Sequence, residues 1–274
     1  MGNRRSDVGQ APSFARSRKV NGNNHRVRWY KADLHIHTVL SPCAELSMGP
    51  KDIVQKALTC ELDMIAITDH NSAQNIAGVM QAARDTNLTV IPGMEVYSRE
   101  EAHMICLFET VEHAAHFQDV IYEHLPKGKN DPDWFGNQYV VDGDENIVEE
   151  CPKLLAMPTN LHVHEIVSFV IDLGGIVYPA HIDRRSNSML SALGFIPSNY
   201  PLDALEIALP LESALQRHDF LKSSPFSLIR SSDAHMIEQL GSKVTWFYLQ
   251  APTVAELKKA MKRQDGRRTS LANG

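Results

Sequence analysis

His35 and His37 are the residues of this sequence that suggest chemistry most directly. They lie in segment 33–38, which reads DLHIHT, within an apolar run that predicts a strand. Alternate residues of a strand point to the same side, so we expect the two imidazoles to converge while Leu34 and Ile36 face the other way. Two convergent imidazoles form a chelate that suits Zn, Mn or Fe. With 13 histidines in the chain, one such pair alone means little.

Residue types that bind metals recur after the other apolar runs. Asp69 and His70 follow one run directly, and Glu95 follows the next. The remaining members of the set are His103, His181, Asp233 and His235. In an α/β barrel the carboxyl ends of the strands meet at one mouth, where active sites are built. Each residue alone is more simply a helix cap or a hydrogen-bonded histidine, but their joint placement predicts a site for several metal ions.

The sequence also predicts the elements that would position these residues. Apolar residues have helical spacing within 53–58, 76–83, 161–173 and 257–261. The predicted strands are 32–37, 64–68, 89–92, 104–108, 176–179, 204–207, 227–230 and 245–249. This alternation favours an α/β fold with a parallel sheet, here a closed or nearly closed barrel. We expect one domain over 29–264, because barrels of this length commonly form a single domain.

Three segments depart from the alternation. Residues 1–28 contain seven basic residues and one acid, which predicts a basic, disordered extension. Residues 126–159 are rich in Asp, Asn, Gly and Pro, which predicts a lid or insertion loop. The aromatic residues of that segment, which favour a lid that packs over something, are Trp134, Phe135 and Tyr139. Residues 265–274 are polar and are expected to form a disordered tail.

Composition limits the class of protein. The chain has 274 residues, 43% of them hydrophobic, and a net charge of −6, which is typical of a globular body without a nucleic-acid-binding surface. The basic extension lacks the apolar core of a secretory signal, and no run is long enough to span a bilayer. The cysteines have no CxxC spacing. We therefore expect a cytoplasmic protein in which Cys60, Cys106 and Cys151 are reduced thiols.

Five short motifs, HIH, TDHN, GME, PAH and SDAH, follow one another along the chain. In this order and spacing they resemble the motif set of the PHP (polymerase and histidinol phosphatase) family, over about residues 31–261. The resemblance implies a single distorted (β/α)7 TIM-like barrel. It also implies two or three divalent ions (Zn, Mn or Fe) at the mouth of the barrel and hydrolysis of phosphoesters.

The resemblance further implies a division of the ligands among the ions. One ion would be held by His35, His37, Glu95 and Asp233. Glu95 would bridge to a second ion held by His103 and His181. His70 and His235 would hold a third ion, with Asp69 nearby as a ligand or as a group that orients one.

The third site departs from the usual family pattern. Many members place an Asp or His shortly after the His-x-His pair, whereas this chain reads SPCAE at 41–45. Either Cys43 or Glu45 would then complete the site. A thiolate favours Zn or Fe, whereas a carboxylate suits Mn as well.

A phosphoester substrate also needs a cationic group and a proton donor. Arg184 and Arg185 follow His181 closely, and a guanidinium matches phosphate oxygens in bidentate fashion. A surface ion pair is the competing interpretation, above all for Arg185. Asp69, His70 or a water on a metal ion are the candidates for the general acid.

Other polar residues have a simpler interpretation. His162 and His164 also form a His-x-His pair, but they begin a predicted helix, where residues two apart diverge. Three further histidines on a predicted helix are expected to be solvated, namely His113, His116 and His124. A basic stripe predicts a solvated helix face that would at most attract an anionic substrate, and it comprises Lys258, Lys259, Lys262 and Arg263.

These observations predict a metal-dependent hydrolase that acts on a small phosphorylated metabolite or nucleotide. The alternatives are an exonuclease that trims short RNA or DNA ends, a histidinol-phosphate phosphatase, and a non-catalytic metal-binding regulatory module. A short oligonucleotide would fit a barrel mouth, but the acidic body disfavours long nucleic acid. No membrane partner is expected.

Overall fold

The protein is described by a computed structural model that covers residues 26–271. The strands of its barrel are β1 (Arg28–Ile36), β2 (Met64–Ile67), β3 (Thr89–Tyr97), β4 (His103–Leu107), β7 (Ile176–Pro179), β8 (Ala204–Glu206), β9 (Ser227–Ile229), β10 (Thr245–Leu249) and β11 (Arg268–Leu271). The helices are α1 (Pro50–Thr59), α2 (Ile76–Ala83), α3 (Val111–His124), α5 (Val163–Asp172), α6 (Met189–Leu193), α7 (Leu211–Arg217), the 3-10 helix η1 (Asp219–Ser223) and α8 (Val254–Met261). The elements within 126–159 are described below.

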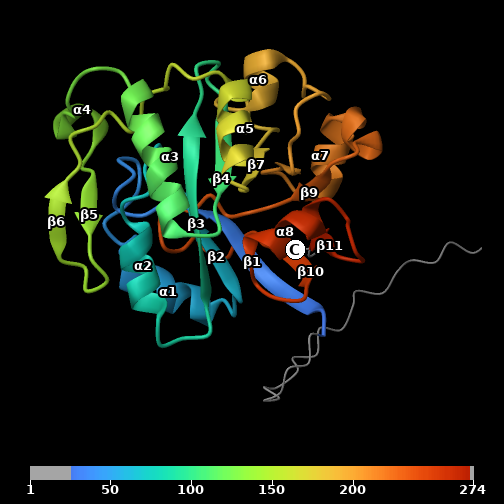
Figure 1. The fold of residues 1–274 in the computed structure, drawn as a ribbon, viewed down its shortest axis with the longest axis horizontal. Coiled ribbons are helices and arrows are strands. Elements are labelled where there is room, and N and C mark those ends of the chain that lie inside the picture. Colours follow the sequence, from blue (N-terminus) through green and yellow to red (C-terminus); the bar gives the residue numbers. More distant parts are fainter. Residues whose placement is uncertain (1–25, 272–274) are drawn as a thin grey trace, which may run out of the picture.

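Seven strands form one curled sheet in the order β11-β10-β1-β2-β3-β4-β7 (Figure 1). Strands β8 and β9 form a separate parallel pair that lies between β7 and β11. Backbone bonds join this pair to its neighbours, such as the 2.9 Å bond from the N–H of Asp203 to the carbonyl of Val177. The predicted barrel is therefore present as a half-barrel sheet that the β8–β9 pair nearly closes.

The expected parallel sheet is only partly correct. Strands β1, β2 and β3 are parallel, but β4 runs antiparallel to both β3 and β7, and β10 runs antiparallel to β1. A parallel connection needs a crossover of a dozen or more residues, whereas only residues 98–102 separate β3 from β4. The chain turns back at once, so β4 begins at the same end of the sheet where β3 ends.

Two apolar layers hold the sheet. Inward side chains such as Leu34, Tyr178 and Phe247 form a core inside the barrel. Leu257 and Met261 of α8 belong to this inner core, so α8 closes the end of the barrel where β7 begins. The second layer packs α1, α2, α3 and α5 against the outside of the sheet (Figure 1). One end of the barrel is thus filled by apolar side chains, and the other is left for polar groups.

The segment 126–159 is an ordered insertion and not a structureless loop. It contains α4 (Pro132–Phe135) and the hairpin of β5 (Tyr139–Val141) and β6 (Ile147–Glu150), which lie beside α1, α2 and α3 (Figure 1). The side chain of Asn75, the residue immediately before α2, donates to the carbonyl of Tyr139 at 3.0 Å. Of the three aromatic residues on which the lid prediction rested, Trp134 is 83% exposed and Phe135 40%, whereas Tyr139 packs against the outer core. The sequence revealed the insertion but not its hairpin.

The predicted ends of the domain need correction as well. Arg28 is the first residue of β1 and pairs with Asp63 at 3.1 Å, while the rest of the predicted basic extension, 1–25, lies outside the described residues. The predicted disordered tail is wrong at 268–271, because these residues form β11 against β10. Residues 272–274 again lie outside the described range. Between residues 26 and 271 no helix is both long and apolar enough to cross a bilayer.

Gly78 sets how closely the insertion packs on α2. A Cβ at this position would lie 2.6 Å from the carbonyl oxygen of Val141. Gly78→Ala should therefore lower the melting temperature and speed proteolysis of the hairpin, although alanine alone would stabilise the helix by about 1 kcal/mol. Met80→Ala, at a position 38% exposed on the same helix, is the control and should change neither measurement much. A higher melting temperature for Gly78→Ala would contradict this account of the packing.

Candidate metal centre

His35 and His37 converge at the open end of the barrel, but not by simple alternation. Leu34 belongs to the inner core and Ile36 to the outer one, so the expectation that they share a face is wrong. The register of β1 against β2 shifts between Asp33 and Ile36, and such a bulge re-aims the side chains around it. As a result the two Nε2 atoms lie 3.1 Å apart.

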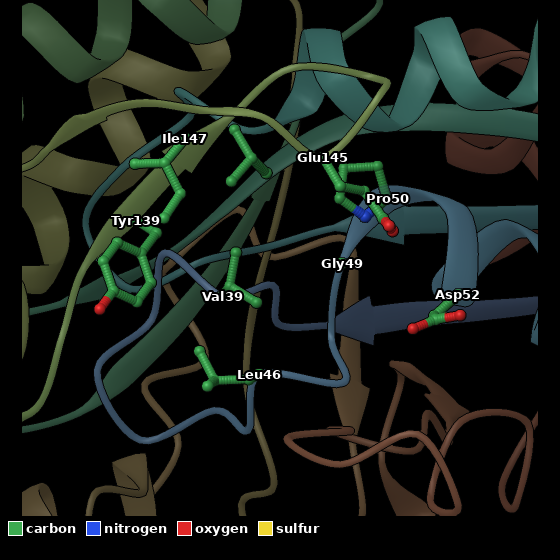
Figure 2. Close-up of a pocket in the computed structure, with 9 residues that line it drawn as sticks. Val39, Leu46, Gly49, Pro50, Asp52, Tyr139, Glu145 and Ile147 are labelled. Atoms are coloured by element: carbon green, nitrogen blue, oxygen red, sulfur yellow. The ribbon is translucent and has the colours of Figure 1, made fainter.

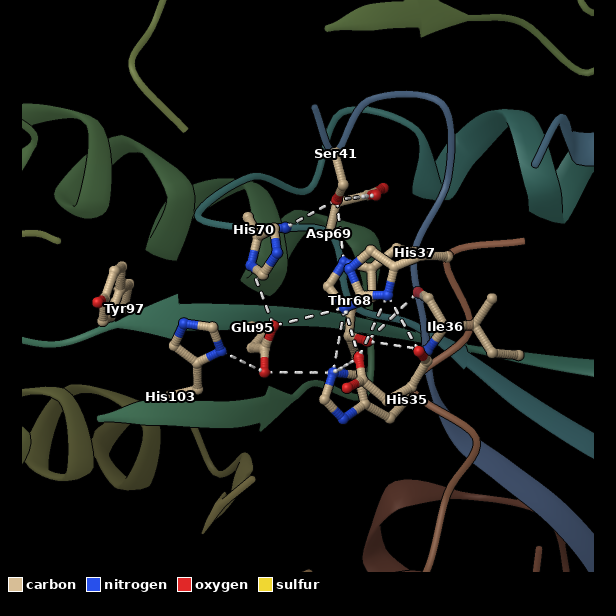
Figure 3. A network of polar contacts seen from close by, with 12 residues as sticks. His35, Ile36, His37, Ser41, Thr68, Asp69, His70, Glu95, Tyr97 and His103 are labelled. Carbon is tan, nitrogen blue, oxygen red and sulfur yellow. Dashed lines mark hydrogen bonds and ion pairs between the residues drawn. The ribbon is translucent and has the colours of Figure 1, made fainter. Parts of the chain in front are cut away.

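Glu95 lies at the centre of the site (Figure 3). Strand β3 extends past its predicted end because the backbone of Asp69–Asn71 pairs with it at Glu95. The carboxylate is surrounded by imidazoles. Its Oε1 lies 2.9 Å from His103 Nδ1, 3.2 Å from His181 Nε2 and 3.3 Å from His35 Nε2. Its Oε2 lies 3.0 Å from His70 Nδ1 and 3.4 Å from His37 Nε2.

The antiparallel strand β4 explains why His103 reaches this mouth. His103 begins β4 and pairs in register with Tyr97, the last residue of β3. A residue at the start of a parallel strand would have been at the opposite end of the barrel. Figure 3 shows the His103 ring between Glu95 and Tyr97.

Asp233 completes the arrangement from the loop after β9. Its backbone has a positive φ of 55°, and its N–H donates to the carbonyl of His35 at 2.9 Å. This conformation turns the carboxylate back toward β1. Oδ1 lies 3.1 Å from His35 Nε2 and 3.2 Å from His37 Nε2, while Oδ2 lies 2.6 Å from Arg184 Nη2.

One group of four buried side chains fits a metal ion closely, and its members are His35, His37, Glu95 and Asp233. The measured separations of 3.1–3.4 Å between their facing atoms approach the ligand spacing of about 3.3–3.6 Å in a tetrahedral zinc site. Within the described chain, Glu95 Oε2 and Asp233 Oδ1 are buried without a hydrogen-bond partner. Buried carboxylate oxygens normally have one, so these two atoms are suited to an ion.

Two further groups share members with the first. His70, Glu95 and His103 form one, and His37, His70 and His235 form the other. Cys43 is exposed and is not a member of any of the three groups, but its thiol contacts His70 and His235 of this last group. Burial opposes ionisation of the thiol, but the contacts with these two histidines lower the pKa of Cys43 to about 6. A thiolate at this position is a soft ligand.

The charges of the cluster compensate one another. Burial alone would raise the pKa of Glu95, but nearby His103 and His35 hold it well below its usual range. Burial likewise would lower the pKa of His35, yet Asp233, Glu206 and Glu95 raise it well above the ordinary value. The site therefore favours a positive charge at its centre, which a divalent cation would supply in place of a proton.

Two residues predicted as possible ligands lie outside the three ligand groups. Glu45 is exposed and its carboxylate lies 3.5 Å from the Ser47 hydroxyl, outside the three ligand groups. Asp69 is buried, but its oxygens accept from the N–H and hydroxyl of Thr38 and from the hydroxyl of Ser41, at 2.7–2.8 Å. Asp69 therefore fixes the loop after β1, and through Ser41 it fits the orienting role that was predicted beside that of a ligand. Ser41 in turn lies 3.0 Å from His37 Nδ1.

Arg184 and Arg185 differ in their placement. Arg184 reaches the cluster through its ion pair with Asp233 and remains 44% exposed. Arg185 is exposed, with no contact to the cluster in the part of the chain that the structure describes. The histidines set aside above also lie elsewhere, since His162 pairs with Glu100 at 2.9 Å on the surface. All four residues of the basic stripe have acceptors, as in the 3.1 Å contact of Lys262 with Asp203.

Sequence reasoning missed two buried carboxylates that hold the site together. Asp33 accepts from the N–H groups of Ser232 and Gly241, both at 2.9 Å, and so ties β1 to the loop that contains Asp233. Burial raises the pKa of Asp33 to about 6. Glu206 at the end of β8 lies 3.1 Å from His35 Nδ1. The only feature of the sequence that could have identified Glu206 is its position near the end of the predicted strand 204–207.

A separate pocket of about 260 Å³ lies between the hairpin and the loop after β1 (Figure 2). Apolar side chains such as Leu46 and Ile147 line it, together with the carboxylates of Asp52 and Glu145. None of its lining residues belongs to the ligand groups. The acidic lining makes this pocket a poor site for a phosphate.

A comparison with family models finds a match over part of the chain. The PHP domain model matches residues 33–154, which include every cluster residue from His35 to His103. No curated protein matches the chain. Among solved structures, the lesion-specific endonuclease Endonuclease Q from Pyrococcus furiosus is 19% identical over 88% of this chain and 57% of its own, with a TM-score of 0.63.

Two other solved structures have the same fold. Endonuclease Q in complex with a 27-mer duplex substrate is 19% identical, with a TM-score of 0.64 over 88% of this chain and 58% of that one. A two-domain protein from Bacteroides vulgatus, described as containing a PHP-like metal-dependent phosphoesterase, is 14% identical, with a TM-score of 0.51 over 96% of this chain and 69% of that one. The chain thus spans little more than half of Endonuclease Q. At these identities the likeness establishes the fold alone.

Cys43 and Glu45 offer a matched pair of variants for the third ligand group. We expect Cys43→Ala to lose part of the bound zinc or iron, because its thiol contacts His70 and His235. Glu45→Ala should retain the wild-type content, because its side chain points to Ser47. Metal content per chain, measured by mass spectrometry after dialysis, separates the two. Loss of metal from Glu45→Ala alone would reverse the assignment.

Proposed function

We propose that the chain is a metal-dependent phosphoesterase of the PHP family, whose domain model matches residues 33–154, and that it hydrolyses the phosphate ester of a small metabolite or nucleotide. The observation that supports this most strongly is the position of Glu95. Its two oxygens face histidines of all three ligand groups, as a carboxylate shared between neighbouring ions would. A non-catalytic module would not need so many ligands in one mouth.

In this proposal the ligands divide among the ions as follows. One ion would be held by His35, His37, Glu95 and Asp233. Glu95 with His103 and His181 would hold a second, and His70, His235 and Cys43 would hold a third. Divalent ions in such a site make a water molecule more acidic and offset the charge of phosphoryl oxygens. The softness of the thiolate favours Zn or Fe at the third position, whereas the first two positions would also accept Mn.

Arg184 is the proposed phosphate-recognition residue. Its guanidinium lies against Asp233 at the edge of the cluster and is accessible from solvent. Guanidinium groups bind phosphate oxygens in pairs of charge-assisted hydrogen bonds. Asp233 thereby holds the group in position before a substrate enters, which lowers the entropic cost of binding.

The surface charge favours a small substrate over a long nucleic acid. The exposed part of the hairpin is acidic at Asp144, Glu145, Glu149 and Glu150. On α8, Lys259 contacts Glu256 at 3.4 Å and Lys258 donates to the carbonyl of Gly175 at 2.6 Å. A track for a polynucleotide backbone needs basic side chains that are available to phosphates.

Nuclease activity is the second candidate, and one specific observation favours it. Endonuclease Q, which has the same fold, has been seen with a DNA duplex. This chain spans just over half of that enzyme.

A substrate panel distinguishes these candidates. We expect Mn²⁺-supported release of phosphate from nucleoside mono- or bisphosphates or small sugar phosphates, and loss of activity after chelation. The other members of the panel are histidinol phosphate, short oligoribonucleotides and short DNA duplexes. Glu95→Gln is the control, because removal of the shared charge should lower kcat by at least about 100-fold. Cleavage of oligonucleotides alone would support the nuclease instead, and full activity of Glu95→Gln would contradict the proposal.

Arg184→Ala should reduce kcat/KM for the best substrate by about 10- to 100-fold, since a charge-assisted hydrogen bond contributes about 1.5–3 kcal/mol. Arg185→Ala is the matched control, because this neighbour is exposed and does not touch the cluster. Steady-state kinetics at equal metal content provides the measurement. Equal effects of the two substitutions would mean that Arg184 only contributes to the general charge of the mouth.

A further inference from the structure

Glu206 is a buried carboxylate behind the ligand cluster. Its side chain is 1% exposed, and it ends β8, a strand that contributes none of the ligand groups. A buried charge is costly unless neighbours compensate it. The contacts of Glu206 therefore indicate why the residue is there.

The first contact of Glu206 is with the ring of His35. Its Oε1 lies 3.1 Å and its Oε2 3.3 Å from His35 Nδ1. A carboxylate can only accept, so Nδ1 carries the hydrogen and the lone pair of the neutral ring is on Nε2. Nε2 is the atom that faces Asp233 Oδ1 and Glu95 Oε1. The geometry thus selects the tautomer that a metal ion requires.

The second contact is with the backbone of another ligand. The N–H of His181 donates to Glu206 Oε1 at 3.1 Å. His181 has a positive φ of 28°, a backbone conformation that a residue with a Cβ rarely adopts. The bond to Glu206 helps to hold this conformation, which brings His181 Nε2 to 3.2 Å from Glu95.

We propose that Glu206 is a positioning residue that couples two ion sites, by orienting His35 in one and holding the backbone of His181 in the other. The inference rests on the proposed metal-dependent function. The comparison with His37 is informative, because its Nδ1 meets the neutral hydroxyl of Ser41. Of these two rings, only that of His35 has a carboxylate at Nδ1, which makes it the more basic ligand.

The test is the metal affinity of Glu206→Gln and Glu206→Ala. Bound metal is first removed from the 274-residue chain. Zn²⁺ or Mn²⁺ is then titrated into it in competition with a chromophoric chelator. We expect both variants to bind about 10- to 100-fold more weakly, with two ions affected, because partners of ligating histidines have effects of this size. Glu206→Gln should lose less than Glu206→Ala, since its amide oxygen can still accept one hydrogen bond. Affinities within twofold of wild type for both variants would overturn the proposal.

Asp203→Asn is the matched control. Asp203 is also buried and lies just before β8, but it accepts from the N–H of Val177 at 2.9 Å and pairs with Lys262, away from the ligands. It should lower the melting temperature and leave metal affinity unchanged. An equal loss of affinity in Asp203→Asn would show that Glu206 acts only through the stability of the barrel, which also overturns the proposal.

Two outcomes separate this inference from the proposed function. A wild-type protein that binds the ions but hydrolyses no phosphoester would refute the function and leave the affinity test of Glu206 intact. Normal hydrolysis and normal metal affinity in Glu206→Gln would refute the inference alone. If Glu206→Ala does not fold, as judged by circular dichroism of the stripped protein, the Glu206→Gln result decides.

Discussion

The burial of Glu95 is the constraint on which the site depends. A carboxylate taken out of water costs several kcal/mol unless opposite charges and hydrogen bonds replace the solvent. Here its two oxygens are surrounded by five imidazole rings, those of His35, His37, His70, His103 and His181. No single strand can supply so many partners, so the carboxylate is tolerable only in a barrel that brings several strand ends to one point. Cations bound between these groups would complete the compensation.

The barrel meets this demand through its irregularities. A bulge in β1 turns His35 and His37 inward, and an abrupt reversal between β3 and β4 brings His103 to the same mouth. The positive φ values of His181 and Asp233 aim two further ligands. Regular strands would have pointed about half of these side chains into the helical layer. Backbone strain at such positions is common in functional sites, where the surrounding fold holds it.

The residues that converge at the mouth of the barrel could be predicted from sequence because their signal is local. His70, His181 and Asp233 each follow a short apolar run that reads as a strand, and strand ends of a barrel converge. Glu206 and the true role of Asp69 depend on distant partners, since the Glu206–His35 contact spans 171 positions. Residue type left Asp69 as either a ligand or a group that orients one, and only the fold of the loop after β1 shows that Thr38 and Ser41 occupy its oxygens.

The same distinction applies to the elements. Most predicted strands are correct because their apolar runs are buried on both faces, as in Ile65 and Ala66 of β2. Strand β11 was missed because its residues are polar and its stability comes from pairing with β10. The hairpin in 126–159 was missed because β6 is fully exposed and has no apolar pattern to detect.

The antiparallel pairing of β1 with β10 joins the beginning of the described chain to its last part. His35 and Asp233, which face the same point, are separated by nearly the whole barrel in sequence. Such contacts have high contact order, and domains rich in them fold slowly. During synthesis, His35 and His37 emerge long before Asp233. They could share an ion with it only after the strands around residue 230 have been made and have folded. We therefore expect tight metal binding only after the whole barrel has folded, because a truncated or half-translated barrel would contain only some of the metal-binding residues.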